Sequence, residues 1–479
     1  MRFSSVWVRL TLLFLLGVLL FLGFTDWRQS SANQQPSAVT LAPLPQDPFI
    51  QVYFNQSQSA SYTDPYRQQT RSGDDLEQVI IEAIRSAKSS VDVAVQELNL
   101  PQIAQALVEQ KQAGVRVRVV LENNYSRPMS GLSATEVAQL DDRARRKYEE
   151  FVQLVDRDGD GQLSQAEVNQ GDALVILRNA QIPFLDDTAD GSKGSGLMHH
   201  KFVLIDDTTL IMGSANFTLS DIHGDFGFPD SRGNANHLLR ITSPAIVKLF
   251  RDEFNLMWGD GVGGQPDSLF GLQKPYRSPQ TISLTNNSSI TLQFSPTSSR
   301  LPWEQSVNGL IGRTLSRADQ SVDLMLFVFT EQNLTNILET HHQRGVPIRA
   351  LIDSGFAYRD YSEALDMMGV AMPNNQCRYG ENNRPWSRPI ASVGVPDLPQ
   401  GDLLHHKVGV LDSRMVITGS HNWSAAANEK NDENLLIIDN PIVAAHFQRE
   451  FDRLYSNAIL GLPVRIQEKI QQQQARCAS

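Results

Sequence analysis

The chain has 479 residues, more than one ordinary domain needs, so at least two lobes with cores of their own are expected. Hydrophobic residues make up 41% and charged residues 20% of the chain, which is typical of a globular protein and excludes a disordered or wholly membrane-embedded one. The formal net charge of −11 disfavours a general nucleic-acid-binding protein, although it is compatible with a local basic groove.

The first 28 residues are predicted to be a signal peptide or a membrane anchor. An uncharged apolar run from Leu10 to Phe24 follows Arg2 and Arg9, and basic residues on this side of such a run place the rest of the chain outside the cytoplasm. The run has the length of a signal-peptide core, but a snorkelling Arg9 could extend it, and the small residues Ser30–Ala32 lie rather far from it for cleavage. We therefore expect an extracytoplasmic protein that is either membrane-anchored or secreted.

The two ends of the remaining chain are predicted to lie outside its folded lobes. Residues 29–50 are rich in Gln, Ser, Ala and Pro and lack apolar periodicity, as a linker does, and residues 461–479 form a glutamine-rich tail. Cys377 and Cys477 could form a disulfide in an exported protein, but one such bond cannot be the framework of so long a fold.

The body between these ends is an internal duplication. SVDVAVQELNL at residues 90–100 returns as SVDLMLFVFTE at 321–331, and GVRVRVVLE at 114–122 returns as GVPIRALID at 345–353. A stretch with helical periodicity separates the members of each pair, so each copy reads as strand, helix, strand. Nearly continuous apolar strands are typical of a parallel or mixed sheet covered by helices, so we expect an α/β fold. The expected lobes are residues 51–265 and 285–460.

The first copy carries an insertion at about residues 133–170, which reads as helix, acidic loop and helix and opens with a Ser133–Glu136 capping box. Its loop, DRDGDGQLSQAE, resembles an EF-hand and predicts a Ca²⁺ site, because a hard cation needs many oxygen ligands, a glycine for the sharp turn and a closing carboxylate. No second such loop accompanies it, so a structural or regulatory site is expected rather than a paired sensor. The predicted ligands are Asp156, Asp158, Asp160, Gln162 through its backbone carbonyl, Ser164 and Glu167.

A basic run lies on the first helix of this insertion. Its simplest interpretation is a solvated helix face, and the alternative is attraction to anionic lipid headgroups. The run consists of Arg143, Arg145, Arg146 and Lys147.

Two copies of one polar motif carry the chemistry: GLMHHKFVLIDDTTLIMGSANFT in the first half and DLLHHKVGVLDSRMVITGSHNWS in the second. The histidine and the lysine stand at alternate positions, so on a strand both side chains project from the same face. One such pair would be weak evidence, but the copies match at six polar or glycine positions with identical spacing, one of them Gly213 with Gly419. The matched residues are His199, Lys201, Asp206, Ser214 and Asn216, and His405, Lys407, Asp412, Ser420 and Asn422.

These residue types suit the cleavage of a phosphodiester. One imidazole can attack phosphorus while a second protonates the leaving alkoxide, and two lysines with serine and asparagine side chains can hold the remaining phosphate oxygens. The chemical step then needs no metal.

The doubled motif resembles the phospholipase D superfamily, whose signature is HxK, a following aspartate and GSxN, present twice in most members. The resemblance covers both lobes, and it implies a duplicated phospholipase D-like fold with one active site between them. It further implies a covalent phosphohistidine, with His199 as the nucleophile and His405 as the acid and later the base.

One position departs from symmetry. Glu433, in NDENLLI, matches the carboxylate that orients a motif histidine in this family, whereas the corresponding NANHLLR of the first half offers Asn236. We therefore expect Glu433 to support His405 and His199 to be the less basic histidine.

The resemblance leaves the substrate open. Hydrolysis of phospholipid headgroup esters is favoured, because the N-terminal segment would place the site near lipid and the acidic body disfavours nucleic acid. The alternatives are an exported nuclease and a phosphatidyltransferase with the same site. A non-catalytic calcium-dependent binding protein is a further class, but it would be expected to have a broken HxK motif, and both copies are intact.

Overall fold

The computed structural model describes residues 41–192, 196–285, 287–380 and 382–478. Both lobes belong to one compact unit, Ala42–Ser479. The segment predicted to be a signal or anchor lies outside the described residues. Among the helices that are described, none combines the length and apolar character needed to cross a membrane.

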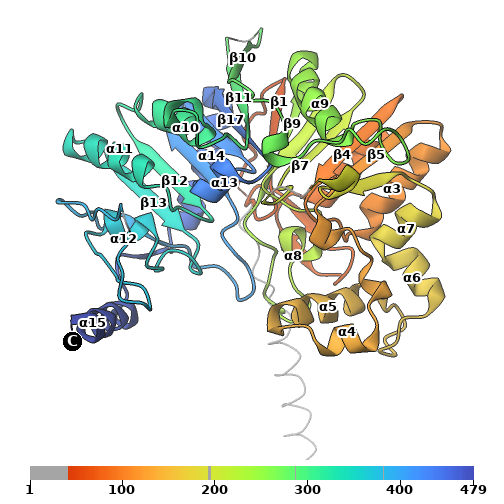
Figure 1. The fold of residues 1–479 in the computed structure, drawn as a ribbon, viewed down its shortest axis with the longest axis horizontal. Helices are drawn as coiled ribbons and strands as arrows, with labels where there is room; N and C mark the ends of the chain where they lie inside the picture. Colours follow the sequence, from red (N-terminus) through yellow and green to blue (C-terminus); the bar gives the residue numbers. More distant parts are fainter. Residues whose placement is uncertain (1–40, 193–195, 286, 381, 479) are drawn as a thin grey trace, which may run out of the picture. The chain divides into compact units, whose positions relative to one another are not determined.

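The first lobe is built on a seven-stranded mixed sheet (Figure 1). The strands β4, β5 and β6, on one side of the sheet, run parallel, and the remaining neighbours pair antiparallel. In order across the sheet the strands are β1 (Ile50–Phe54), β9 (His237–Thr242), β8 (Thr209–Gly213), β7 (Lys201–Ile205), β4 (Ser90–Val95), β5 (Arg116–Leu121) and β6 (Phe184–Asp186).

The second lobe repeats this order with one additional strand at each edge. β12, β13 and β14 are its parallel strands, as their counterparts are in the first lobe. The order is β10 (Gln280–Ser283), β11 (Ser289–Ser295), β17 (Glu433–Asp439), β16 (Met415–Gly419), β15 (Lys407–Leu411), β12 (Val322–Leu326), β13 (Ile348–Ile352), β14 (Val393–Val395) and β18 (Ile459–Leu460). A separate hairpin joins β2 (Ser61–Thr63) to β3 (Thr70–Ser72).

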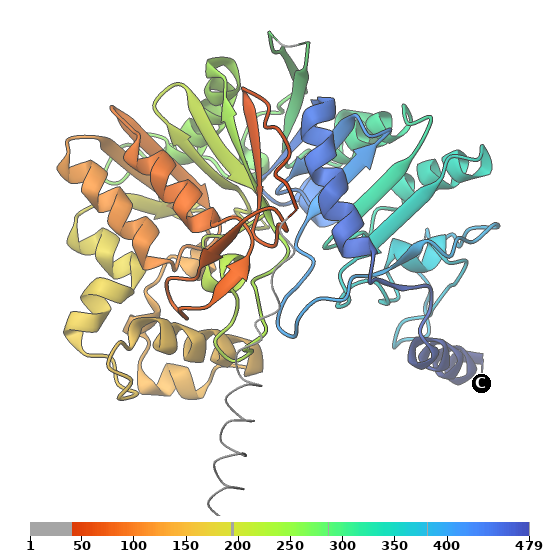
Figure 2. The same cartoon turned by 180° about the vertical axis from the view of Figure 1, so that it is seen from behind.

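Helices cover both sheets (Figures 1 and 2). The first lobe contains α2 (Leu76–Arg85), α3 (Pro101–Gln112), α7 (Ala173–Asn179), α8 (Leu219–Ile222) and α9 (Pro244–Trp258), besides the inserted helices. The second contains α10 (Val307–Leu315), α11 (Gln332–Gln343), α12 (Glu363–Met367), α13 (Ala425–Glu429), α14 (Pro441–Tyr455) and α15 (Val464–Ala478). Two mixed sheets with helices on them confirm the predicted α/β duplication.

The two copies share one hydrophobic core in addition to a core of their own. The helices that close each copy, α9 and α14, both begin with a polar N-cap followed by proline at the first helical position, as in Ser243–Pro244 and Asn440–Pro441. Their aromatic side chains, such as Phe250 and Phe447, pack in one cluster with strands of both lobes. The lobes therefore fold against each other rather than as separate domains.

The insertion forms two helices before the acidic loop where the sequence predicted one. The Ser133–Glu136 capping box is present, but α4 (Ala134–Ala138) ends after little more than one turn. Asp141 then caps a new helix, α5 (Asp142–Val155), and α6 (Gln165–Gly171) follows the loop. The break occurs because Asp141 accepts a hydrogen bond from the backbone N–H of Ala144 and so starts a second helix.

The folded body extends further at both ends than the sequence predicted. The last part of the predicted linker belongs to the body, because Asp47 accepts a hydrogen bond from the Asn440 amide and strand β1 already begins at Ile50. The predicted tail contains α15, whose Ile470 is buried against the second lobe. A disulfide between Cys377 and Cys477 fastens this helix.

Candidate active site

The two HxK motifs lie where the lobes meet. His199 and His405 stand two residues before the equivalent strands β7 and β15 begin. The backbone N–H of His199 donates to the carbonyl of Asp432 (3.0 Å), and that of His405 donates to the carbonyl of Ala235 (3.1 Å). Each histidine is thus fixed by the backbone of the opposite lobe.

The side-chain partners of the histidines cross in the same way. Nδ1 of His199 lies 2.7 Å from Oε2 of Glu433, and Nδ1 of His405 lies 3.0 Å from Oδ1 of Asn236. The expectation that Glu433 supports His405 is therefore wrong. That expectation assumed that each histidine is supported by a residue of its own copy. In the structure Asn236, just before β9, and Glu433, the first residue of β17, each contact the motif histidine of the other copy.

The structure adds a carboxylate that sequence comparison missed. Oδ1 of Asp221, on α8, lies 3.4 Å from Nδ1 of His405. Although burial alone would raise it, His405 and surrounding asparagine amides lower the pKa of Asp221 to about 2, so this group is an anion. Both histidines therefore have a carboxylate beside Nδ1, and the charge that Asn236 lacks is supplied by Asp221.

The surroundings of the two histidines control their protonation. Burial, reinforced by the charge of the two motif lysines, holds the pKa of His199 and of His405 well below its usual value. Burial also raises the pKa of Glu433, which makes this carboxylate a better hydrogen-bond acceptor. When Glu433 is ionised it can only accept, and in that state Nδ1 of His199 carries the proton and Nε2 keeps a lone pair.

The motif lysines are fully buried beside the histidines. Nζ of Lys201 donates to the His199 carbonyl (2.9 Å) and to Gln96 (3.2 Å), and Nζ of Lys407 donates to the His405 carbonyl (2.6 Å). Burial lowers the pKa of Lys201 to about 8, and burial with repulsion from Lys201 lowers that of Lys407 to about 7. Two buried ammonium groups at this point favour an anion such as phosphate.

The serines and asparagines of the motifs support these groups. Ser214 donates to Oδ1 of Asn236 (2.7 Å), the same atom that faces His405, and Ser420 accepts from the backbone of Asn434 (3.1 Å). Among the described residues, the side-chain oxygens of Asn216 and Asn422 are buried without a hydrogen-bond partner. An orphaned polar atom in each copy fits a site that a polar ligand completes.

The motif aspartates do not lie with the catalytic candidates, which corrects that part of the prediction. Asp206 accepts backbone hydrogen bonds from Ser89 (2.7 Å) and Ser90 (3.0 Å), and Asp412 does the same at the start of β12. Each stands at the far end of its strand from the lysine, roughly 16 Å away for a strand of this length. The aspartates fix the turns that align the central strands.

The acidic loop has the oxygen donors that a hard cation requires. Carboxylate oxygens of Asp156, Asp158 and Glu167 lie within 4.8 Å of one another, and Gly161 has a φ of 78°, which a non-glycine residue rarely adopts. Asp160 is not in this group and accepts a hydrogen bond from the backbone of Gln162 (2.7 Å), whereas the Ser164 hydroxyl donates to Oε2 of Glu167 (2.7 Å). Three of the predicted ligands are thus gathered, and the chemistry of the donors fits Ca²⁺.

Comparison with known proteins agrees with the fold. A mitochondrial cardiolipin hydrolase of Xenopus tropicalis is 31% identical over 157 residues, which is 32% of this chain and 64% of that protein. A phospholipase D of Rickettsia felis is 27% identical over 148 residues, 31% of this chain and 64% of that protein. The chain thus spans less than two thirds of the length of these curated relatives.

A solved structure and a family model cover both lobes. The phosphatidylserine synthase of Haemophilus influenzae has the same fold, with a TM-score of 0.54 and 13% identity over 91% of this chain and 95% of that one. The family model described as cardiolipin synthase, PLD-like domain, matches residues 80–258 and 311–455. These matched segments contain the histidines and the lysines of both motifs, and the chain belongs to this phospholipase D-like family.

Proposed function

We propose that the protein is a phosphodiesterase that hydrolyses phospholipid headgroup esters through a phosphohistidine. The observation that carries the proposal is the pair of buried histidines, each with a carboxylate at Nδ1, set between two buried lysines where the lobes meet. The relatives named cardiolipin hydrolase and phospholipase D, together with the negative net charge, favour lipid over nucleic acid as the substrate.

In the first step, Nε2 of His199 attacks phosphorus and the bond from phosphorus to the headgroup oxygen breaks. His405, protonated with Asp221 beside it, gives its Nε2 proton to the departing alkoxide. Lys201 and Lys407 hold the other phosphate oxygens as charge moves onto them. The products of this step are the free headgroup alcohol and a phosphohistidine.

In the second step, neutral His405 takes a proton from water, whose oxygen attacks phosphorus and breaks the bond to His199. Phosphatidic acid leaves, and both histidines return to their starting states. An alcohol in place of water would give phosphatidyl transfer by the same route, so product analysis with added alcohol separates hydrolase from transferase.

The proposal includes the surroundings of the site. The protein is extracytoplasmic, held near lipid by its N-terminal segment or secreted, and Ca²⁺ at the Asp156–Glu167 loop has a structural or regulatory role outside the chemical step. The convergence of Asp156, Asp158 and Glu167 supports this assignment.

The decisive experiment offers the full-length protein phospholipid vesicles and plasmid DNA in parallel assays. We expect release of headgroup alcohol and no cleavage of DNA. Cleavage of DNA with intact lipid would make the protein a nuclease, and inertness toward both would overturn the proposal.

Covalent trapping tests the roles of the histidines. With a phosphodiester that has a good leaving group, His405→Ala should form a phosphohistidine and stall, whereas His199→Ala should form none. The control is His342→Ala, because His342 stacks on Trp386 in the second lobe and is not part of the site. This variant should turn over normally. An adduct on His405 in the His199→Ala protein would reverse the assignment, and no adduct in either folded variant would refute the covalent route.

A further inference from the structure

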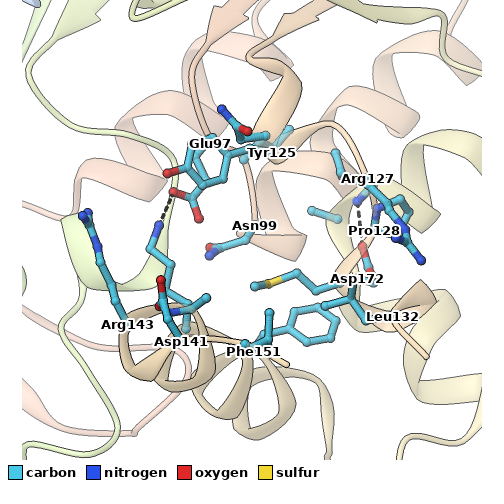
Figure 3. A pocket seen from close by; sticks show the side chains of 18 residues that line it. Glu97, Asn99, Tyr125, Arg127, Pro128, Leu132, Asp141, Arg143, Phe151 and Asp172 are labelled. Atoms are coloured by element: carbon cyan, nitrogen blue, oxygen red, sulfur yellow. Dashed lines mark hydrogen bonds and ion pairs between the residues drawn. The ribbon is translucent and has the colours of Figure 1, made fainter. Parts of the chain in front are cut away.

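A pocket of about 400 Å³ lies beside the candidate active site, between α5 of the insertion and the segment that follows β5 (Figure 3). In Figure 3, Phe151 and Asp141 of the helical wall face Tyr125 and Glu97 on the opposite wall, and Asn99 points between them. The pocket is a product of the insertion, because α5 forms one whole wall of it.

The interior of the pocket is largely apolar and suits hydrocarbon. Its aliphatic and aromatic side chains come from both walls, and several of them are only half-buried because they face the cavity. A pocket of this size and lining is typical of sites for small apolar groups. The residues are Leu98, Met129, Leu132, Leu140, Phe151 and Leu174.

One cation at the rim is not engaged in an ion pair. Nζ of Lys147 pairs with Glu97 (2.8 Å) and lies 4.7 Å from the centre of the Tyr125 ring. The carboxylates of Asp141 and Asp172 are each used at a helix N-terminus, which lessens their negative field. Arg143 is exposed and has no ion-pair partner among the described residues, so its charge is available to a ligand.

The pocket and the candidate active site share a wall. Glu97 is the neighbour of Gln96, which accepts a hydrogen bond from the ammonium of Lys201. Asn99 accepts one from the backbone of Leu219 (3.2 Å), the first residue of α8, the short helix that carries Asp221. A ligand chain in the pocket would therefore end next to the lysines and to Asp221, the partner of His405.

We propose that this pocket binds one acyl chain of an anionic phospholipid while its phosphodiester lies at the two histidines; the inference rests on the proposed function. The apolar interior takes the hydrocarbon, and Arg143 faces the negative headgroup region. The insertion thereby selects long-chain lipid over other phosphodiesters.

Photolabelling tests occupancy without turnover. A phosphatidylglycerol with a diazirine in one acyl chain is added in mixed micelles to the His199→Ala protein, irradiated, and the labelled peptides are identified by mass spectrometry. We expect label within residues 125–151, and an additional Ala144→Trp change, which fills the pocket from α5, should abolish it. The matched change Ala134→Trp, at an exposed position of α4, should leave it intact. Label elsewhere, or label that survives Ala144→Trp, would overturn the proposal.

Kinetics on otherwise unchanged protein test selection. Ala144→Trp should lower kcat/KM for dioleoyl phosphatidylglycerol about tenfold or more, because burial of even a few methylenes is lost, and change that for the chainless bis(4-nitrophenyl) phosphate less than about twofold. Arg143→Glu, a surface change, should act in the same direction. Equal loss on both substrates, or no loss on either, contradicts the pocket. Absence of turnover in the unchanged protein contradicts the proposed function instead, and the photolabel then still decides whether the pocket holds a chain.

Discussion

At the scale of single residues, the two histidines differ in what lies at Nδ1. His199 has one carboxylate at hydrogen-bond distance, and His405 has an amide oxygen with a carboxylate slightly further away. The residue types and spacings of the motifs were readable from the sequence. Which side chain supports which histidine was not readable. Comparison of the two halves assigns to each histidine a partner from its own copy, whereas in the structure each histidine contacts the partner from the other copy.

Asp221 could not be recognised as a site residue from the sequence for a different reason. It stands three residues after Thr218, which caps α8, and in the sequence this spacing is that of an ordinary helix-capping acid. The second copy has Ala427 at the equivalent place, so the duplication gave no signal either. Only the approach of His405 from the other lobe distinguishes Asp221 from a cap.

Neutralising Glu433 should impair the nucleophile. Glu433→Gln removes the anion that orients His199, and we expect kcat to fall on the order of 10³-fold or more, as when the acid of a histidine–acid pair is replaced by its amide. Loss of the anion also lowers the pKa of His199, so the acidic limb of the kcat/KM profile should move to lower pH. The pH dependence of turnover and a circular dichroism check of folding measure this. Unchanged turnover would show that the carboxylate does not act through His199.

The buried lysines should set the alkaline limb of activity. Lys407 and Lys201, with pKa lowered to about 7 and about 8, lose their protons as the pH rises through these values, and phosphate binding weakens with them. We expect KM to rise above about pH 7–8 while kcat changes less, because bound anionic substrate restores the protons. Lys407→Arg, whose guanidinium stays protonated, should shift the limb upward in whatever activity remains. A KM that is flat to pH 10 would contradict this.

At the scale of elements, the apolar runs of the sequence predicted the central strands, but one helix cap and one helix were missed. SVDVAV and VDLML became fully buried strands because continuous apolar residues need cover on both faces. The break between α4 and α5 and the existence of α15 were missed, because Asp141 was not recognised as a cap and a glutamine-rich sequence has little apolar periodicity.

Calcium at the Asp156–Glu167 loop should stabilise the protein without joining the reaction. Saturating Ca²⁺ should raise Tm in the unchanged protein, since a ligand that binds only the folded state adds stability, and should have no effect on Asp156→Ala. Asp230→Ala, at an exposed loop position, is the matched control and should respond as the unchanged protein does.

The same samples test the chemical step. Turnover of bis(4-nitrophenyl) phosphate by folded, chelator-treated protein should persist. Its loss, with the fold intact, would make the cation a participant in the chemistry.

At the scale of the whole molecule, the sequence predicted the duplication but not how the two copies pack against each other. Repeated sequence identifies two copies of one fold, but the shared core, in which α14 of the second copy contacts β1 of the first, arises from side chains that look like ordinary core residues in either copy. The sequence of an apolar helix face does not indicate which of the two sheets the helix will cover.

The disulfide should anchor the C-terminal helix to the second lobe. Cys377 and Cys477 close a loop of 100 residues, and loops of this length restrict the unfolded chain strongly. We expect Cys477→Ser to lower Tm by a few degrees, Cys377→Ser to match it, and the double variant to add nothing. Turnover of the chainless substrate should be preserved. An unchanged Tm in all three variants would mean that α15 unfolds apart from the rest.

The crossed contacts of His199 with Glu433 and of His405 with Asn236 make the molecule equivalent to a two-fold symmetric dimer whose two subunits have been fused. The exposed part of the connection between α9 and β10, residues 262–267, is then a tether: it contributes no histidine, lysine or carboxylate of the site, and it keeps one half at high effective concentration beside the other. The later part of this connection packs between the copies, since the buried Lys274 pairs with both Glu253 and Asp432. A chain cut within this tether would keep every partner of the site and lose only that concentration. The halves would have to find each other as two molecules do, and activity would depend on dilution.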